Sequence, residues 1–184
     1  MTFIVILIII ALIVIAVVSI YNKLVRLRNT VKSSWSDIDV QCKKRFDLVP
    51  NLVETVKGYA SHEKTVFEKV TQARAMAMQA SSPAEMAKAE NMIRDTLKSL
   101  FAVAEAYPEL KANANFMQLQ NQLQELESSI EHARRYYNAV VRDFNILIES
   151  FPSNLIASQF NFKQAELFQL ETPEAERKPV KVSF

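Results

Sequence analysis

The hydrophobic pattern of the chain opens with an unbroken apolar run. Residues 3–20 (FIVILIIIALIVIAVVSI) contain no charged side chain, and Ser19 is their single polar residue. As an α-helix this run extends about 27 Å, close to the thickness of the hydrocarbon core of a bilayer. The pattern therefore predicts a transmembrane helix over residues 3–20.

The flanks of the run favour an uncleaved anchor over a signal peptide. Only Met1 and Thr2 precede it, neither side chain is charged, and no small-x-small cleavage pattern follows it. A secretory signal has a basic start, a shorter apolar core and such a cleavage site. No cysteine stands at the end of the run, which also argues against lipoprotein processing.

The charges beside the run predict its orientation. Lys23, Arg26, Arg28 and Lys32 follow it, and no Lys or Arg precedes it. Because the flank richer in Lys and Arg stays in the cytoplasm, we expect residues 1–2 outside and the remaining domain inside. The same four side chains are candidates for contact with anionic lipid head groups.

After the anchor, apolar residues recur with the 3.6-residue period of one helical face. The pattern predicts that the anchor helix continues into the cytoplasm and on toward residue 78. Pro50 should kink or break it, and Gly58 is a milder weak point. This stripe consists of Leu24, Leu27, Val31, Trp35, Ile38, Cys42, Phe46, Val49, Val53, Val56 and Ala60.

Three further helices are expected. Ser82-Pro83-Ala84-Glu85 is a helix start with a Ser cap, Pro at the first position and Glu in capping-box position, and it predicts a helix over residues 83–107. Asn113 or Asn115 can cap the next helix, whose apolar residues repeat every 3.5 positions as far as Phe151, as in a coiled-coil seam. Ser153 or Asn154 can cap a shorter fourth helix that carries Leu155, Ile156, Phe160, Leu167 and Phe168.

The expected fold is all-α: a transmembrane helix followed by an elongated antiparallel four-helix bundle over residues 21–170. Residues 171–184 contain prolines and charges and are expected to be disordered. The single glycine among 184 residues supports the all-α class, since the turns of β-structure depend on glycine.

Helix lengths raise the question of what covers the first part of the stripe. A helix over residues 83–107 is too short to cover both halves of the first helix, which leaves the membrane-proximal half partly unpaired. This half either folds back at Pro50 against the third helix or packs on other copies of the chain, and we expect self-association to a homo-oligomer. The predicted self-association residues are Leu24, Leu27, Val31, Trp35, Ile38, Cys42 and Phe46.

Composition excludes some classes of function. The net charge is +2, too balanced for a nucleic-acid binder. Residues 21–50 carry seven basic and three acidic side chains, whereas residues 51–184 carry fifteen basic and seventeen acidic. The excess of positive charge therefore lies beside the predicted membrane segment. Cys42 is the only cysteine, so the chain cannot form an internal disulfide.

The candidate catalytic and metal-binding residues have simpler structural interpretations. His62-Glu63 begins like the zinc motif H-E-x-x-H, but position 66 is Val. His132 stands alone on a predicted helix surface, and Cys42 occupies a stripe position typical of a buried thiol. We expect no catalytic residue, no metal and no cofactor.

One aromatic group and one charged group of residues are also interpreted as structural. Trp35 with Tyr136-Tyr137 could line a ligand groove, but aromatic residues at helical spacing are usually core. The charged residues near the stripe are interpreted as a solvated helical face rather than an acid–base cluster. They are Asp37, Asp39, Lys43, Lys44, Arg45 and Asp47.

Several segments, spread over residues 1–168, resemble the LemA family. They are residues 21–29 (YNKLVRLRN), 35–41 (WSDIDVQ), 44–53 (KRFDLVPNLV), 57–63 (KGYASHE), 104–113 (AEAYPELKAN), 134–138 (RRYYN), 141–143 (VRD) and 151–154 (FPSN). Cys42 departs from the Leu expected in that family. The resemblance implies a bacterial inner-membrane protein with one N-terminal span and a cytoplasmic four-helix bundle. It supplies no catalytic role, and the association of some relatives with specialised bacterial membranes makes membrane organisation a plausible theme.

Two functions fit these observations. The first is a non-enzymatic, membrane-anchored, self-associating scaffold that organises a bacterial membrane or its proteins. The alternative is a cytoplasmic-face adaptor or sensory domain that recruits or regulates another membrane protein, such as a protease or kinase. In either case the expected partners are membrane lipids, further copies of the chain and other membrane proteins.

Overall fold

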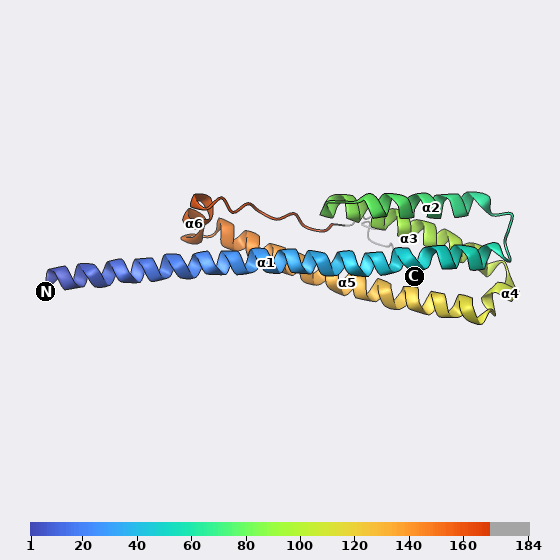
Figure 1. Ribbon diagram of the computed structural model, residues 1–184, viewed down its shortest axis with the longest axis horizontal. Coiled ribbons are helices and arrows are strands. Elements are labelled where there is room, and N and C mark those ends of the chain that lie inside the picture. Colours follow the sequence, from blue (N-terminus) through green and yellow to red (C-terminus); the bar gives the residue numbers. More distant parts are fainter. Residues whose placement is uncertain (170–184) are drawn as a thin grey trace, which may run out of the picture. The chain divides into compact units, whose positions relative to one another are not determined.

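The computed structural model describes residues 1–169, and every regular element in that range is an α-helix. The predicted disordered tail at 171–184 lies outside the described residues. The helices are α1 (Thr2–Lys57), α2 (Lys64–Gln79), α3 (Pro83–Glu105), α4 (Pro108–Lys111), α5 (Ala114–Glu149) and α6 (Ser153–Gln159) (Figure 1). The all-α prediction is confirmed for this part of the chain.

The chain divides into two compact units. Unit 1 contains residues 1–40 and 130–167, and unit 2 contains residues 41–129 together with residues 168 and 169. Both α1 and α5 contribute to each unit, so the two units share no clean boundary in sequence. The predicted arrangement as one antiparallel four-helix bundle stays a prediction.

Unit 1 places the C-terminal part of α5, α6 and the chain after it around the turns of α1 that follow the apolar run. Its buried cluster consists of Leu24, Phe144, Ala157 and Phe162, with Ile20 among the half-buried residues around it. The apolar stripe beyond the anchor is therefore covered by the chain itself. In Figure 1 the dark-blue start of α1 extends past α6 with no other helix beside it.

The chain after α6 is held to α5 by side-chain bonds to its backbone. Asn145 accepts a hydrogen bond from the Ala165 N–H (2.8 Å), and its Nδ2 donates to the Ala165 carbonyl (2.9 Å). Tyr137 donates its hydroxyl to the carbonyl of Glu166 at 2.8 Å. These bonds give an extended segment the backbone partners that a helix would have supplied internally.

Unit 2 packs α2 against α3, which lie side by side in Figure 1. The predicted start of α3 is confirmed: Ser82 is the N-cap, its hydroxyl accepts from the Glu85 N–H at 3.2 Å, and Pro83 opens the helix. The Glu85 carboxylate accepts from the Ser81 N–H and hydroxyl, and these bonds lower the pKa of Glu85. Asn113 caps the start of α5 by accepting from the Phe116 N–H at 3.1 Å.

Three predicted details are wrong. Of the kink or break expected at Pro50, the break does not occur, because α1 continues through Pro50 and ends at Lys57, just before Gly58. Residues 64–79, expected as part of the first helix, form a separate helix, α2.

The third correction concerns the fourth helix, which is only Ser153–Gln159. Neither Ser153 nor Asn154 caps it: Pro152 is the N-cap residue, and the Ser153 hydroxyl donates to the carbonyls of Leu147 and Ser150. Phe160, Leu167 and Phe168 therefore lie beyond the helix that was expected to carry them.

Candidate functional site

Arg45 is the most unusual charged residue in the described chain. Its side chain is only 1% exposed, although it lies on α1 beside the apolar stripe residue Phe46. One guanidinium nitrogen, Nη1, donates to Glu127 of α5 at 2.6 Å, and Nη2 donates to Glu90 of α3. Arg45 therefore links three helices of unit 2 through charged hydrogen bonds.

Burial makes this arrangement costly to disturb. Glu90 is 6% exposed, whereas Glu127 is about half exposed. Two buried atoms, Arg45 Nε and Glu90 Oε1, have no hydrogen-bond partner within the described residues. A buried charge that loses its partner is strongly destabilising, so each member of this group depends on the others.

A groove of about 560 Å³ opens beside Arg45. Its lining includes the nearly buried Leu97 and Leu123, and the half-buried Phe101, whose ring meets the Phe116 ring edge-on at 6.2 Å between centroids. The polar lining residues are Arg45, Arg94, Lys98, Gln120, Gln124 and Glu127. Three of these are cationic and one is anionic, so the groove combines an apolar base with positive charge.

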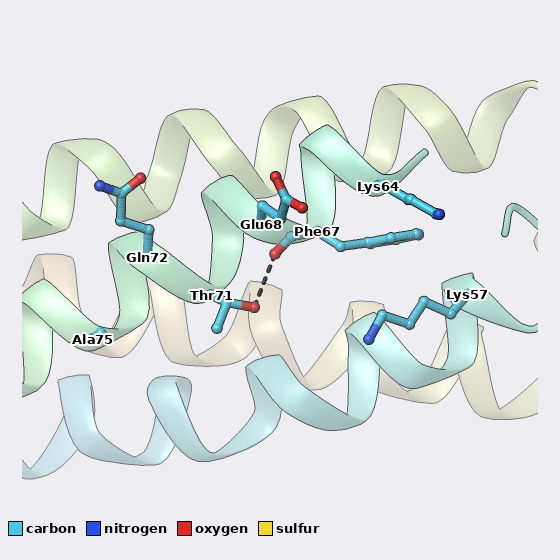
Figure 2. A pocket seen from close by; sticks show the side chains of 7 residues that line it. All are labelled: Lys57, Lys64, Phe67, Glu68, Thr71, Gln72 and Ala75. Atoms are coloured by element: carbon cyan, nitrogen blue, oxygen red, sulfur yellow. Dashed lines mark hydrogen bonds between the residues drawn. The ribbon is translucent and has the colours of Figure 1, made fainter. Parts of the chain in front are cut away.

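A second hollow, of about 500 Å³, lies between the end of α1 and α2 (Figure 2). Phe67 lies between Lys57 and Lys64 in that view, and the Lys57 ammonium is 5.7 Å from the centre of its ring. Lys57 also pairs with Glu54 at 3.1 Å. Thr71 at its wall donates its hydroxyl hydrogen to the Phe67 carbonyl within α2, so this hydrogen is already used inside the helix.

The residues predicted for self-association lie mainly inside the chain. Leu24, Ile38, Cys42 and Phe46 are buried, and Leu27, Val31 and Trp35 are half-buried. The expectation that this stripe is uncovered is therefore wrong. It failed because the C-terminal part of α5 and the chain around α6 cover the stripe in unit 1. Self-association itself stays a prediction.

The candidates for head-group contact are available to solvent. Lys23, Arg26, Arg28 and Lys32 are all exposed on α1 just after the apolar run. The Arg28 guanidinium lies 5.1 Å from the centre of the Phe162 ring, which positions it over the chain that follows α6. Contact of these side chains with lipid stays a prediction.

The burial or exposure of the other candidate residues fits a structural role. Cys42 is a buried thiol, and His62 and His132 are exposed. The Trp35 and Tyr137 rings pack together at 5.6 Å, while Tyr136 is 56% exposed on the same helix. Within residues 1–169, no group of three or more His, Cys, Asp or Glu side chains could hold a metal ion.

Sequence reasoning missed the Arg45 group, since it assigned Arg45 to a solvated face. A signal was present in the spacing. Arg45 comes three residues after the stripe residue Cys42, and Glu90 comes four residues after the core residue Met86. Such spacings place both charged groups on buried helix faces.

Over residues 1–169, these observations define a class: an all-helical protein in which one helix is long and apolar enough to span a membrane and in which the core of one unit includes a buried arginine. The sequence model of the LemA family matches residues 34–184. The chain therefore belongs to the LemA family.

Known relatives agree with this assignment. Protein LemA of Metamycoplasma hominis is 28% identical over 152 residues, covering 80% of this chain and 68% of that protein. Magnetosome protein MamQ 1 of Paramagnetospirillum magneticum is 25% identical over 175 residues, covering 81% of this chain and 64% of that protein. MamQ of Magnetospirillum gryphiswaldense is 22% identical over 174 residues, covering 80% of this chain and 64% of that protein. The match thus spans just under two thirds of the MamQ chains.

Proposed function

We propose that this chain is a non-enzymatic scaffold, anchored in the bacterial inner membrane by residues 3–20, that organises that membrane or its proteins. The observation that carries the proposal is the continuity of α1, which runs from the apolar segment into the core of both units without a break. None of the apolar window in α1 is buried by the described chain, so it is free to contact lipid. The similarity to magnetosome proteins supports a role in organising a membrane.

In this proposal the N-terminus lies outside and the helical units lie in the cytoplasm. The exposed Lys23, Arg26, Arg28 and Lys32 support this orientation, because basic side chains beside a span remain on the cytoplasmic side. In unit 2, Arg45 joins α1 to α3 and α5, and Arg74 of α2 donates to the Phe46 carbonyl of α1 at 2.8 Å. These links support a four-helix bundle in that unit.

The scaffold acts by self-association. The half-buried Leu27, Val31 and Trp35 are the parts of the predicted stripe that a second copy could still reach. Light scattering of the full chain in detergent should therefore give a mass above that of one chain. In membranes, Val31→Cys in a Cys42→Ala background should form dimers with a short bismaleimide, whereas Asn51→Cys, exposed elsewhere on α1, should not. A monomer by scattering together with no cross-link at position 31 would contradict self-association.

The groove beside Arg45 favours a second candidate, an adaptor that recruits another membrane protein. Its exposed Lys98 and half-buried Arg94 surround the apolar Leu97 and Leu123. Such a groove fits an amphipathic segment that carries acidic side chains beside apolar ones. The partner in this candidate is a membrane protein with a segment of that chemistry.

Charge reversal separates the adaptor from the self-associating scaffold. A photo-cross-linker at Gln120, at the groove, should capture one foreign membrane protein in stoichiometric yield, and Arg94→Glu with Lys98→Glu should abolish the capture. Lys69→Glu, on an exposed site of α2 outside the groove, is the matched control and should leave capture unchanged. Capture that survives the double reversal would exclude the groove as the docking site.

A further inference from the structure

Three large apolar side chains near α6 are exposed to solvent, although contact between apolar surface and water is unfavourable. Phe151 is 80% exposed, Leu155 is 62% exposed and Phe160 is 52% exposed, all within ten residues. Single exposed apolar residues are common on soluble proteins, but a group of large ones marks a surface that contacts something else.

This group lies beside the point where α1 leaves its apolar run. The Phe160 ring packs on the Tyr21 ring with 4.7 Å between centroids, and the Phe162 ring lies 6.0 Å from Tyr21. Ile20, the last residue of the run, packs against the same cluster as Ile156 of α6. If residues 3–20 span the bilayer, α6 is therefore held at the level of the lipid head groups.

The charges around the group match that location. Lys23 and Arg26 on α1 are exposed, Arg28 lies over the Phe162 ring, and Lys163 is exposed on the chain after α6. The acidic Glu149 at the end of α5 accepts a hydrogen bond from Gln164. Aromatic and aliphatic side chains flanked by Lys and Arg are typical of segments that lie in the interface of anionic membranes.

We propose that the turn between α5 and α6, together with α6 and Phe160, forms a second membrane contact that inserts Phe151, Leu155 and Phe160 into the lipid interface. The inference rests on the proposed anchoring of residues 3–20. A single spanning helix is free to rotate about its axis, whereas a second contact beside it fixes which face of unit 1 meets the membrane. The occupant of this surface is lipid, and a second copy of the chain is the competing outcome.

Nitroxide accessibility in nanodiscs tests the proposal with the full chain. In a Cys42→Ala background, a spin label is attached to Ile10→Cys, Leu155→Cys or Tyr136→Cys, in discs of phosphatidylethanolamine and phosphatidylglycerol that hold one chain each. Oxygen concentrates in lipid, and a water-soluble nickel complex is excluded from it. We expect the labels at 10 and 155 to be accessible to oxygen and protected from nickel, with position 155 about 5–10 Å into the boundary between head groups and acyl chains. Tyr136, exposed on α5 of the same unit, is the matched control and should report water.

Each other outcome has a distinct meaning. If position 10 reports lipid and position 155 reports water, the second contact is excluded and the anchor stands. If position 10 reports water, the anchoring itself fails, and the second contact fails with it. If position 155 is protected from nickel only in discs that hold several chains, a second copy covers the surface and the inference is overturned.

Discussion

At the scale of single residues, Arg45 shows how a charge can hold a helical core together. It is buried with Glu90 and reaches the half-exposed Glu127, so three helices of unit 2 depend on one guanidinium. Replacement of Arg45 leaves the Glu90 carboxylate without its partner in a buried site. An unpaired buried charge costs more free energy than an ion pair gains in water. Arg45 should therefore contribute more to the stability of the fold than a surface charge does.

The Arg45→Met variant should lower the free energy of unfolding by about 3–5 kcal/mol, measured by urea unfolding in detergent. The double variant with Glu90→Leu should recover most of this loss, because it removes the stranded carboxylate. Arg94→Met, at the neighbouring groove, should cost less than about 1 kcal/mol. A loss at Arg45 no larger than that at Arg94 would contradict the structural role of Arg45.

Tyr137 gives the second prediction at this scale, for alkaline pH. Burial, aided by the Glu166 carboxylate, raises the pKa of Tyr137 above its ordinary value of 10.0. In the unfolded chain the phenol ionises near that value, whereas the folded chain keeps its proton to higher pH. Stability should therefore fall as the pH rises above about 10, since the folded state then binds more protons than the unfolded state.

Comparison with Tyr137→Phe isolates this effect. At pH 7 the variant should be about 1 kcal/mol less stable than the parent chain, because it lacks the hydrogen bond to the Glu166 carbonyl. Above a pH of about 10 that difference should narrow, as measured by unfolding across the pH range. Tyr136→Phe, on the exposed face of α5, should show no such narrowing, and a constant difference for Tyr137→Phe would refute the explanation.

At the scale of elements, α1 explains both what the sequence predicted well and what it did not. The continuation of the anchor helix beyond Tyr21 followed from the 3.6-residue period and is confirmed. The end of α1 could not be predicted from this period. Val56 and Ala60 keep the apolar spacing, but Ala60 lies beyond the helix. Ala60 is buried in the turn, so a hydrophobic pattern alone could not distinguish it from a helical core residue.

Tolerance of Pro50 depends on a residue far away in sequence. Proline lacks the N–H that would bond to the carbonyl four residues earlier, that of Phe46. Arg74 of α2 donates its Nε–H to this carbonyl at 2.8 Å and thus replaces the missing bond. No local rule could predict this contact, which explains why a kink or break at Pro50 was expected.

A double-mutant cycle tests the link between Pro50 and Arg74. Arg74→Met should cost about 1–3 kcal/mol of unfolding free energy, because the Phe46 carbonyl loses its donor. In a Pro50→Ala background the same change should cost clearly less, since the backbone N–H that alanine restores at this position can bond to the Phe46 carbonyl itself. Equal costs in the two backgrounds, by urea unfolding, would show that Arg74 does not compensate for Pro50.

The apolar seam of α5 and the start of α3 were also readable from sequence, because caps and periodicity are local. The groove beside Arg45 and the exposed group at α6 were not. The groove needs side chains from α1, α3 and α5 to meet, and the place of the exposed group depends on how α6 and the chain after it pack on α1. Both depend on tertiary contacts that a single helix pattern does not contain.

At the scale of the whole molecule, the chain is a LemA-family protein whose first helix is proposed to serve both as membrane anchor and as part of the domain core. The domain limits of residues 1–2, 3–20 and 21–170 stay predictions, as does the inner-membrane orientation. What the structure adds is that the stripe after the anchor is covered within the chain. Self-association is therefore left with the half-buried Leu27, Val31 and Trp35, whereas contacts with lipid and with other membrane proteins would use the group at α6 and the groove of unit 2.

The most direct measurement is the side of the membrane on which the helical units lie. In a Cys42→Ala background, Ser129→Cys places one thiol at an exposed site of α5, and a membrane-impermeant maleimide is applied to sealed vesicles of either orientation. The cytoplasmic scaffold predicts labelling of inside-out vesicles alone, with right-side-out vesicles labelled only after detergent opens them. Labelling of intact right-side-out vesicles would place the domain outside and contradict the proposed cytoplasmic scaffold.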